Sequence, residues 1–332
     1  MEIIKERGPF ARYAAGRLVD ELFSLVDVGC SGGIDEAWRL FGENLQAFGF
    51  DPNVQEINRL KREEKARHVS YEAAFIAGEG VLSRNPWSRL AVAKTIAITA
   101  NRRRRLTSKE KTALNAWKET VLAEDTRIHL PTYFENKGIN SIDFIKIDID
   151  GADFEVLQSL SSTLKSARVI GLGLEVNFFG SHDAADNTFH NTDRFMCAQG
   201  FDLFGLTIRK YAMASLPHRY VYTIPAQSIE GRPLQGDALY LRDFGSPDLR
   251  AQAEHYGAEK LLKLAIVFSL AGLPDCAAEI LTAFSAELVS TINIDHALDI
   301  LVGETGLGHK ALTYREVMDA FAQNSEIFYP DL

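Results

Sequence analysis

The sequence predicts an α/β fold in which a doubly wound, mostly parallel sheet is followed by a smaller all-helical region. Apolar runs typical of buried strands alternate with helical segments over residues 22–243, which is the pattern of parallel sheets covered by helices. After Phe244 the strand pattern stops and amphipathic helical segments follow. A chain of 332 residues is long enough for one large domain and a smaller one.

Each expected element rests on its own stretch of sequence. A short amphipathic helix is expected at about residues 10–22 and a second helical segment at residues 34–41. Residues 53–66 have helical periodicity with a charged outer face. Strands are expected at residues 22–29, 45–51, 68–78, 141–150, 167–176, 201–208 and 237–243.

Two segments interrupt the alternation of strands and helices. A helical insertion is expected at about residues 81–124. A boundary near residues 244–248 predicts a first domain over 1–244 and a helical C-terminal domain over 245–332. That tail contains the run "LLKLAIVFSLAGL", which is too apolar to be left exposed. It is expected to pack on the first domain, on its own helices or on a second copy in a homo-oligomer.

Composition and charge exclude several classes of function. The net charge of -9 and the pI near 5.5 argue against broad nucleic-acid binding, which needs Lys and Arg to neutralise phosphates. Cys30, Cys197 and Cys276 are widely spaced and show no disulfide or zinc pattern. The first residues lack the apolar core of a signal peptide, and no apolar run approaches ~20 residues. We therefore expect a cytoplasmic protein without a transmembrane segment.

The run Arg102–Arg105 is the one strongly basic stretch of this acidic chain. A solvent-exposed helix face is the commonest outcome for such a run. The apolar stretch "LAVAKTIAITA" just before it supports a second interpretation, a lid that makes weak contact with a membrane surface or a charged glycan. A nucleic-acid site is the third interpretation, and the overall charge disfavours it.

The stretch "SLVDVGCSGGIDEAW", residues 24–38, predicts a tight glycine turn directly after a buried strand. Its glycines, at 29, 32 and 33, do not have the G-x-G-x-x-G spacing of a dinucleotide site, and no Lys follows Gly33 as a P-loop requires. Asp27, Asp35 and Glu36 surround the turn and would repel a pyrophosphate. The turn therefore favours a ligand without phosphate.

An uncharged nucleoside that carries a cationic group fits this region better. Asp27 can face a positively charged amino acid moiety, and Gly29 and Gly33 let the backbone approach a ligand closely. Asp51 ends the next strand, where a carboxylate can accept hydrogen bonds from ribose hydroxyls. Together these features describe S-adenosylmethionine. The alternative is that Asp51 and the proline after it merely form a turn. The candidate donor-binding residues are Asp27, Gly29, Ser31, Gly33, Asp51 and Pro52.

Three motifs, "VDVGCSGG", "AFGFDPN" and "SIDFIKIDIDGADFEVLQSL", together resemble the FkbM family of S-adenosylmethionine-dependent methyltransferases. The resemblance covers residues 24–77 and 127–175. Ser31 stands where that family often has Asn, and Asp150 and Asp153 stand where it usually has Glu. The resemblance implies a class I methyltransferase (Rossmann-like) fold with a seven-stranded sheet whose last strands are antiparallel. It also implies methyl transfer to a hydroxyl oxygen of a sugar, glycolipid or secondary metabolite.

Acidic residues at the carboxyl ends of the central strands are the candidates for the chemical step. The candidates for orienting or deprotonating an acceptor hydroxyl are Asp148, Asp150, Glu175 and His182. Asp148 is favoured because a carboxylate in so apolar a strand is costly unless it is paired or used. Asp150 can alternatively cap the following helix, Glu175 can face solvent, and His190 is an alternative to His182. Several acids could bind a divalent metal, but their spacing specifies none.

Two rival functions remain at this point. One is an NAD-dependent oxidoreductase on a similar sheet, which the glycine spacing disfavours. The other is a non-catalytic protein-binding module with a degenerate pocket and a partner-binding helical tail. The joint presence of Asp27, Gly29, Asp51 and Asp148 argues against it.

Overall fold

The computed structural model describes residues 4, 8–19, 21–78, 126–149, 152–178, 180, 183–211, 227–305 and 312–328. The expected insertion at 81–124, the run Arg102–Arg105, Asp150 and His182 lie outside the described residues. Contacts divide the chain into two compact units. The first contains residues 24–34 and 46–241, and the second contains residues 4–23, 35–45 and 242–332.

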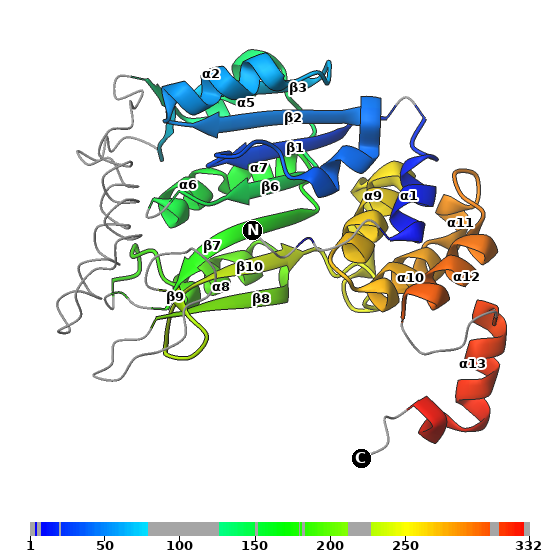
Figure 1. The fold of residues 1–332 in the computed structure, drawn as a ribbon. Coiled ribbons are helices and arrows are strands. Elements are labelled where there is room, and N and C mark those ends of the chain that lie inside the picture. The colour runs from blue at the N-terminus through cyan, green and yellow to red at the C-terminus, as the bar shows by residue number, and fades with distance from the viewer. Residues whose placement is uncertain are drawn as a thin grey trace. The chain divides into compact units, whose positions relative to one another are not determined.

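The first unit contains a mixed sheet with the strand order β3-β2-β1-β6-β7-β10-β8-β9 (Figure 1). Its strands are β1 (Phe23–Val28), β2 (Leu45–Asp51), β3 (Val69–Ala73), β6 (Phe144–Ile147), β7 (Gly171–Asn177), β8 (Asp202–Tyr211), β9 (Gln227–Ser228) and β10 (Arg232–Leu241). The pairs β2–β3, β1–β6 and β6–β7 are parallel, whereas β10 is antiparallel to both β7 and β8. Without the two-residue β9, the main sheet has the seven strands that the sequence analysis expected.

The last strands of the sheet are paired antiparallel, as the sequence analysis expected. Because β8 is antiparallel to β10, and β10 is antiparallel to β7, β8 runs in the same direction as β7. Only β10 and the short β9 run against the others among the described strands of this sheet. Each pairing among the last strands, β7–β10, β10–β8 and β8–β9, is antiparallel.

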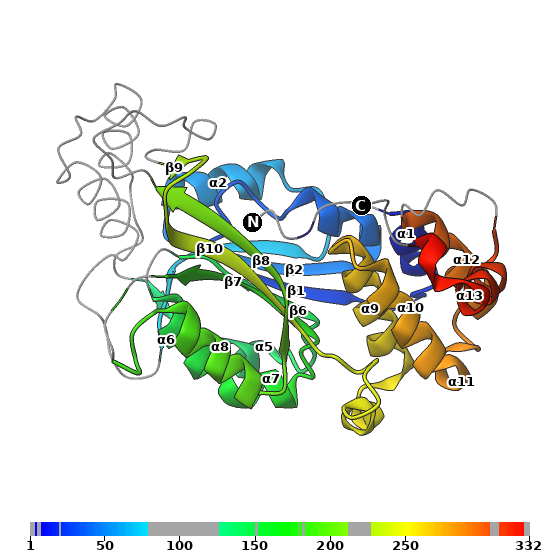
Figure 2. The same cartoon turned by 90° about the horizontal axis from the view of Figure 1, so that it is seen from below.

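Helices cover one face of the sheet and enclose its core (Figure 2). They are α5 (Leu130–Lys137), α6 (Asp153–Ser159), α7 (Ser161–Ser166) and α8 (Phe189–Ala198). Alternate residues of the central strands, such as Val26, Ile145 and Leu174, point into this core and are almost completely buried. The alternate side chains of the same strands, on the opposite face, include the charged residues of the candidate site.

The connection after β2 shows how the sequence sets a helix boundary. Helix α2 (Val54–Glu63) begins after Asn53, whose side chain accepts a hydrogen bond from the Glu56 N–H as an N-cap. Ile57 and Leu60 face inward and are buried. The stretch 68–78, expected as one strand, forms β3 and then β4 (Phe75–Ile76), which leaves the main sheet to pair with β5 (Arg127–Ile128).

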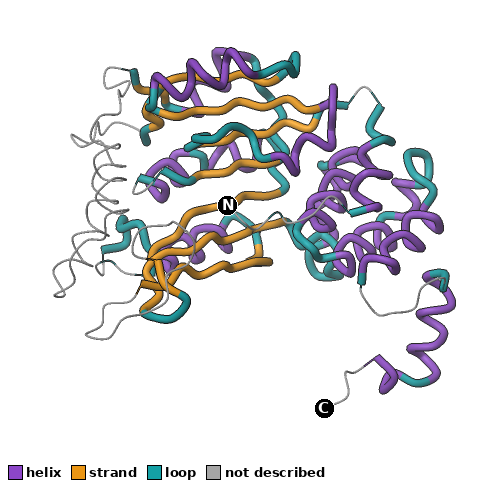
Figure 3. The backbone as a smooth tube through the Cα atoms, viewed as in Figure 1, coloured by secondary structure: helices purple, strands orange, loops and turns teal. Residues whose placement is uncertain are grey.

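The second unit is helical, as Figure 3 shows by its purple tube. It comprises α1 (Pro9–Ala15), η1 (Glu36–Asn44), η2 (Arg250–His255), α9 (Gly257–Leu270), α10 (Pro274–Ala283), α11 (Ser285–Leu288), α12 (Ile294–Glu304), α13 (Tyr314–Gln323) and η3 (Ser325–Phe328). Helix α1 packs against α9 and α12, and η1 is a 3₁₀ helix. The compact helical unit therefore includes N-terminal segments besides the tail, while the functional division at 244/245 stays a prediction.

Helix α9 carries the apolar run that the sequence analysis singled out. Its residues from Lys260 to Leu270 are buried, and it packs against α1, α10 and α11. Lys263 is completely buried, and its Nζ donates to Glu21 Oε1 at 2.7 Å and to the Leu22 carbonyl at 2.6 Å. These partners compensate the buried charge. No helix in the described ranges combines the length and the apolar character needed to cross a bilayer.

Candidate functional site

The glycine turn follows β1 and is fixed by backbone hydrogen bonds. The N–H groups of Gly29 and Cys30 both donate to the Phe50 carbonyl, at 2.8 and 3.1 Å. The Gly32 N–H donates to Glu56 Oε1 at 3.0 Å. A carboxylate therefore already occupies an N–H that a phosphate would need, which agrees with the prediction of a ligand without phosphate. Ser31 and Gly32 are exposed.

The structure gives Gly29 a different role from the one expected. Its φ is +85°, and a Cβ at this position would lie 1.9 Å from the backbone carbonyl oxygen of Asp148. Gly29 is therefore needed for the close approach of β1 and the end of β6, whereas the sequence analysis attributed it to space for a ligand. A Cβ at Gly33 would likewise meet the side chain of Leu60 at 3.0 Å.

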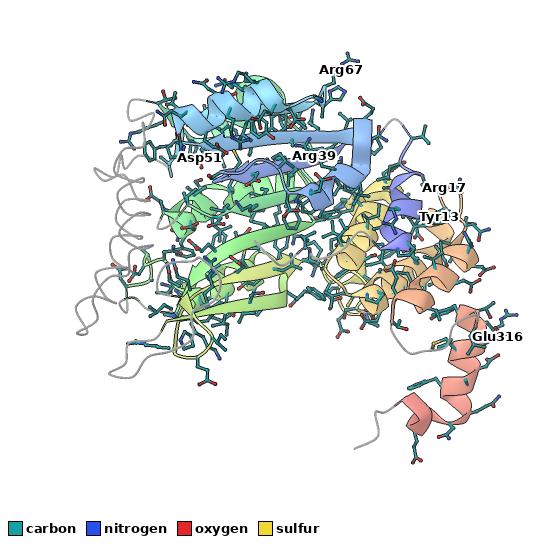
Figure 4. All side chains as sticks on the ribbon, in the orientation of Figure 1. Tyr13, Arg17, Arg39, Asp51, Arg67 and Glu316 are labelled. Carbon is teal, nitrogen blue, oxygen red and sulfur yellow. The ribbon has the colours of Figure 1, made fainter. Side chains whose placement is uncertain are left out.

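Asp51 lies at the carboxyl end of β2 and is 8% exposed (Figure 4). Its Oδ1 accepts a hydrogen bond from the Asn53 N–H at 2.7 Å. Burial raises the pKa of this carboxyl, although the Asn53 hydrogen bond opposes the shift. Pro52 is half-buried beside it. Asp51 thus combines a turn-forming hydrogen bond with the strand-end position at which a ribose is held in related sheets.

Lys146 connects β1, the glycine turn and the end of β6. Its Nζ donates to Asp27 Oδ1 at 3.0 Å and to the Gly29 carbonyl at 2.8 Å, and lies 3.7 Å from Asp148 Oδ2. Burial favours the neutral amine, but Asp27 and Asp148 outweigh it and raise the pKa of Lys146. Burial also raises the pKa of Asp27, against the effect of Lys146. Asp27 was expected to face a cationic ligand, and the structure gives it a cation from the chain itself.

A second ion-pair cluster lies on β7, β8 and β10. Arg209 Nη1 is 3.1 Å from Glu175 Oε1, and its Nη2 is 2.6 Å from Asp237 Oδ1. Glu175 is 2% exposed, so it does not face solvent. Burial raises the pKa of Asp237, Arg209 lowers it, and the nearby charge of Asp148 raises it further.

Strand register places both clusters on one face of the sheet. Asp27 is paired in register with Lys146, Lys146 with Gly173 of β7, and Glu175 of β7 with Asp237. Because Gly173 and Glu175 are two positions apart on β7, they lie on the same face of the sheet. The side-chain exposures differ sharply: 28% for Asp148, 7% for Asp27, 2% for Glu175 and 8% for Asp237. Asp148 is the most accessible of these four carboxylates.

The loop after β7 is held by side-chain hydrogen bonds. Asp153, the first residue of α6, accepts from the Ile149 N–H at 2.9 Å and from Asn187 Nδ2 at 3.2 Å. It therefore joins the end of the β6 motif to the loop over residues 183–188. Asn191 Nδ2 donates to the Asp183 and Asp186 carbonyls, both at 2.9 Å. His190 is exposed and lies 3.4 Å from Thr188 Oγ1.

The glycine turn and Asp51 together have the features expected for binding a nucleoside that carries an amino acid group. A Cβ at Gly32 would meet no atom within 4 Å, so the outer side of the turn has open space for a ligand. The exposed turn and Asp51 belong to neighbouring strand ends at the edge where doubly wound sheets bind their ligands. Within the described ranges, no three Asp, Glu, His or Cys side chains gather as they would around a metal ion.

Sequence reasoning missed Asp237 and the partnership of Arg209. The strand expected there ended at residue 208, but β8 continues to Tyr211 and includes Arg209. The signal for Asp237 was present, because it is a carboxylate in an apolar strand, the same argument that selected Asp148. The pairing itself depends on β10 lying between β7 and β8, which local sequence does not reveal.

Comparison with known proteins identifies the class of this domain. Residues 49–203 match the family model described as the methyltransferase FkbM domain. A search of curated protein sequences gave no significant match.

Solved structures of low sequence identity resemble the chain over much of its length. A precorrin-6y methyltransferase from Geobacter metallireducens is 13% identical over 70% of this chain and 86% of that chain, with a TM-score of 0.33. The magnesium protoporphyrin IX methyltransferase of Synechocystis PCC 6803 with bound SAM is 8% identical over 70% and 77%, with a TM-score of 0.31. A SAM-dependent methyltransferase from Aquifex aeolicus is 10% identical over 72% and 92%, with a TM-score of 0.29.

Proposed function

We propose that this chain, whose residues 49–203 match the methyltransferase FkbM domain, transfers a methyl group from S-adenosylmethionine to a hydroxyl oxygen. The proposed acceptor is a hydroxyl of a sugar, glycolipid or secondary metabolite, as the family resemblance implies. The family match favours this reaction over an NAD-dependent oxidoreductase. Measured turnover would separate it from a non-catalytic binding module.

The donor side of the site is proposed to consist of the glycine turn and the end of β2. Ser31 and Gly32 of the turn are exposed, although the Gly32 N–H is already bonded to Glu56. Asp51 offers a carboxylate for ribose hydroxyls. When bound, S-adenosylmethionine supplies an electrophilic methyl group. The chain contributes mainly by holding donor and acceptor in a reactive arrangement, which accounts for a large part of the rate of such transfers.

The solvent exposure of Asp148 is the observation that supports its proposed role beside the acceptor hydroxyl. Asp27, Glu175 and Asp237 are almost buried and each has a cation within 3.1 Å. Asp148 is 28% exposed, lies at the end of the central strand β6 and is farther from its cation, at 3.7 Å. A carboxylate that is both accessible and anchored can orient an acceptor hydroxyl and take its proton. Glu175 is more consistent with support of Arg209 and Asp237 than with direct proton transfer.

The proposal is tested first by screening acceptors and then by removing the carboxylate. Native protein is incubated with S-adenosylmethionine and hydroxylated sugars, glycolipids or phenols, and S-adenosylhomocysteine release is measured. With a productive acceptor, Asp148→Asn is expected to lower turnover about 10²–10⁴-fold, with little change in donor affinity. Asp295→Asn, at an exposed position of α12, is the matched control and should keep native turnover.

Two outcomes would contradict the proposal in different ways. A product methylated at nitrogen or carbon would refute the oxygen acceptor. Native turnover in folded Asp148→Asn would remove Asp148 from the chemical step and leave Asp150, Glu175, His182 and His190 as candidates.

A further inference from the structure

The contacts of Lys146 reach both the proposed donor side and the proposed acceptor side. One nitrogen atom, Nζ, donates to Asp27 and to the Gly29 carbonyl, and faces Asp148. The side chain is 16% exposed, so these interactions are largely shielded from water.

The contacts of Lys146 fix positions as well as compensating charge. A buried ammonium needs anionic partners, and Asp27 alone would supply one. The hydrogen bond to the Gly29 carbonyl also holds the glycine turn in place, just before the exposed residues Ser31 and Gly32. The approach to Asp148 adds a fixed point on β6, whose end already meets β1 through the hydrogen bond from the Asp148 N–H to the Val28 carbonyl at 3.0 Å.

We propose that Lys146 is a positioning residue that couples the glycine turn to Asp148. It thereby keeps the distance between the bound donor and the Asp148 carboxylate constant. This inference rests on the proposed function, because it assigns the turn to the donor and Asp148 to the acceptor. Lys146 touches neither reacting group in this arrangement and acts through Gly29, Asp27 and Asp148.

Loss of the ammonium has a consequence for pH dependence. The titratable groups around Nζ in the described part of the chain are Asp27 and Cys30 from β1 and its turn, Asp51 from β2, and Asp148 from β6 itself. The adjoining strand β7 presents Gly173 in register with Lys146. Burial already raises the pKa of Asp27, and Lys146 opposes this rise. Without Lys146, Asp27 takes up a proton at higher pH, and the turn loses both its charge and its link to Gly29.

The variant Lys146→Met tests the coupling in the full-length protein. Its affinity for S-adenosylhomocysteine, measured by titration calorimetry, is expected to be at least about tenfold weaker than native at pH near 6 and to recover partly near pH 8. The native protein should show a nearly flat profile over the same range. Lys146→Arg, which keeps the charge, should restore the flat profile. Lys165→Met, on the exposed side of α7, is the control and should match native protein.

Turnover separates coupling from a role in donor binding alone. At saturating donor, Lys146→Met is expected to lower kcat at least about tenfold, because Asp148 loses its anchor. Native kcat in this variant would overturn the coupling. Native affinity for S-adenosylhomocysteine across the pH range would overturn the role in the turn.

A second variant covers the case in which Lys146→Met does not fold. Lys146→Met combined with Asp27→Asn removes both buried charges and leaves neither uncompensated. It should bind S-adenosylhomocysteine weakly and without pH dependence, and native affinity in it would refute the proposal. Absence of binding in the native protein would instead refute the donor assignment, on which this inference rests, so the two failures are distinguishable.

Discussion

Replacement of Gly29 by Ala tests the role that the structure gives to the glycine turn. The positive φ of +85° costs an Ala residue roughly 1–2 kcal/mol. The new Cβ would also lie 1.9 Å from the Asp148 carbonyl oxygen, so backbone must move, at a cost of about 1–3 kcal/mol typical of overpacking. The expected loss of unfolding free energy is therefore about 2–5 kcal/mol, out of a total of about 5–15 kcal/mol for a typical domain.

Gly32→Ala is the matched control for this prediction. Gly32 has a similar φ of +92°, but a Cβ there would meet no atom within 4 Å. Its expected cost is only the backbone part, about 1–2 kcal/mol. Urea unfolding of native protein and both variants without ligand gives the comparison directly. Equal losses in the two variants would refute the claim that Gly29 is required by the packing of β1 against the end of β6.

Three further predictions concern the charged residues of the site. Asp51→Ala should weaken binding of S-adenosylmethionine by about 1–3 kcal/mol in calorimetry, and unchanged affinity would remove Asp51 from the donor site. Burial raises the pKa of Asp51, so the folded protein retains a proton that the unfolded chain has released, and native stability falls as the pH rises above about 3.8. Urea unfolding should therefore show Asp51→Asn gaining stability relative to native protein as the pH is raised from about 3.8, and the reverse trend would contradict the shift. Arg209→Met should lower the free energy of unfolding in urea by about 3 kcal/mol, because it leaves Glu175 and Asp237 without their cation. Lys210→Met, at an exposed position, is the control and should lower it by less than about 1 kcal/mol. Similar losses in the two variants would refute the importance of the ion pairs of Arg209.

The fold was predictable where burial alone decides the structure. Strand β2 has the bounds 45–51 that were expected, because an apolar run ends at a proline that stops the strand. The direction of β8 was not predictable, because it follows from the insertion of β10 between β7 and β8. The helix expected at residues 10–22 ends at Ala15, and its membership of the helical unit depends on contacts with α9 and α12, which are distant in sequence.

The candidate site was predictable as a set of strand ends but not as a set of contacts. Asp27, Asp51, Asp148 and Glu175 were selected as carboxylates near strand ends, and the structure places Asp148 Oδ2 3.7 Å from Lys146 Nζ at the end of β6. The ion pairs of Lys146 with Asp27 and of Arg209 with Glu175 join residues more than thirty positions apart in sequence. Such pairs depend on strand order and register, which no local pattern contains.

Isothermal titration of the native protein with S-adenosylhomocysteine tests the central claim most directly, because it needs no knowledge of the acceptor. The account predicts saturable binding of one molecule per chain with a micromolar dissociation constant, about 8 kcal/mol of binding free energy. NAD⁺ titrated under the same conditions should give no saturable heat. Binding of NAD⁺ without binding of S-adenosylhomocysteine, or binding of neither by folded protein, would contradict the assignment of this site to S-adenosylmethionine.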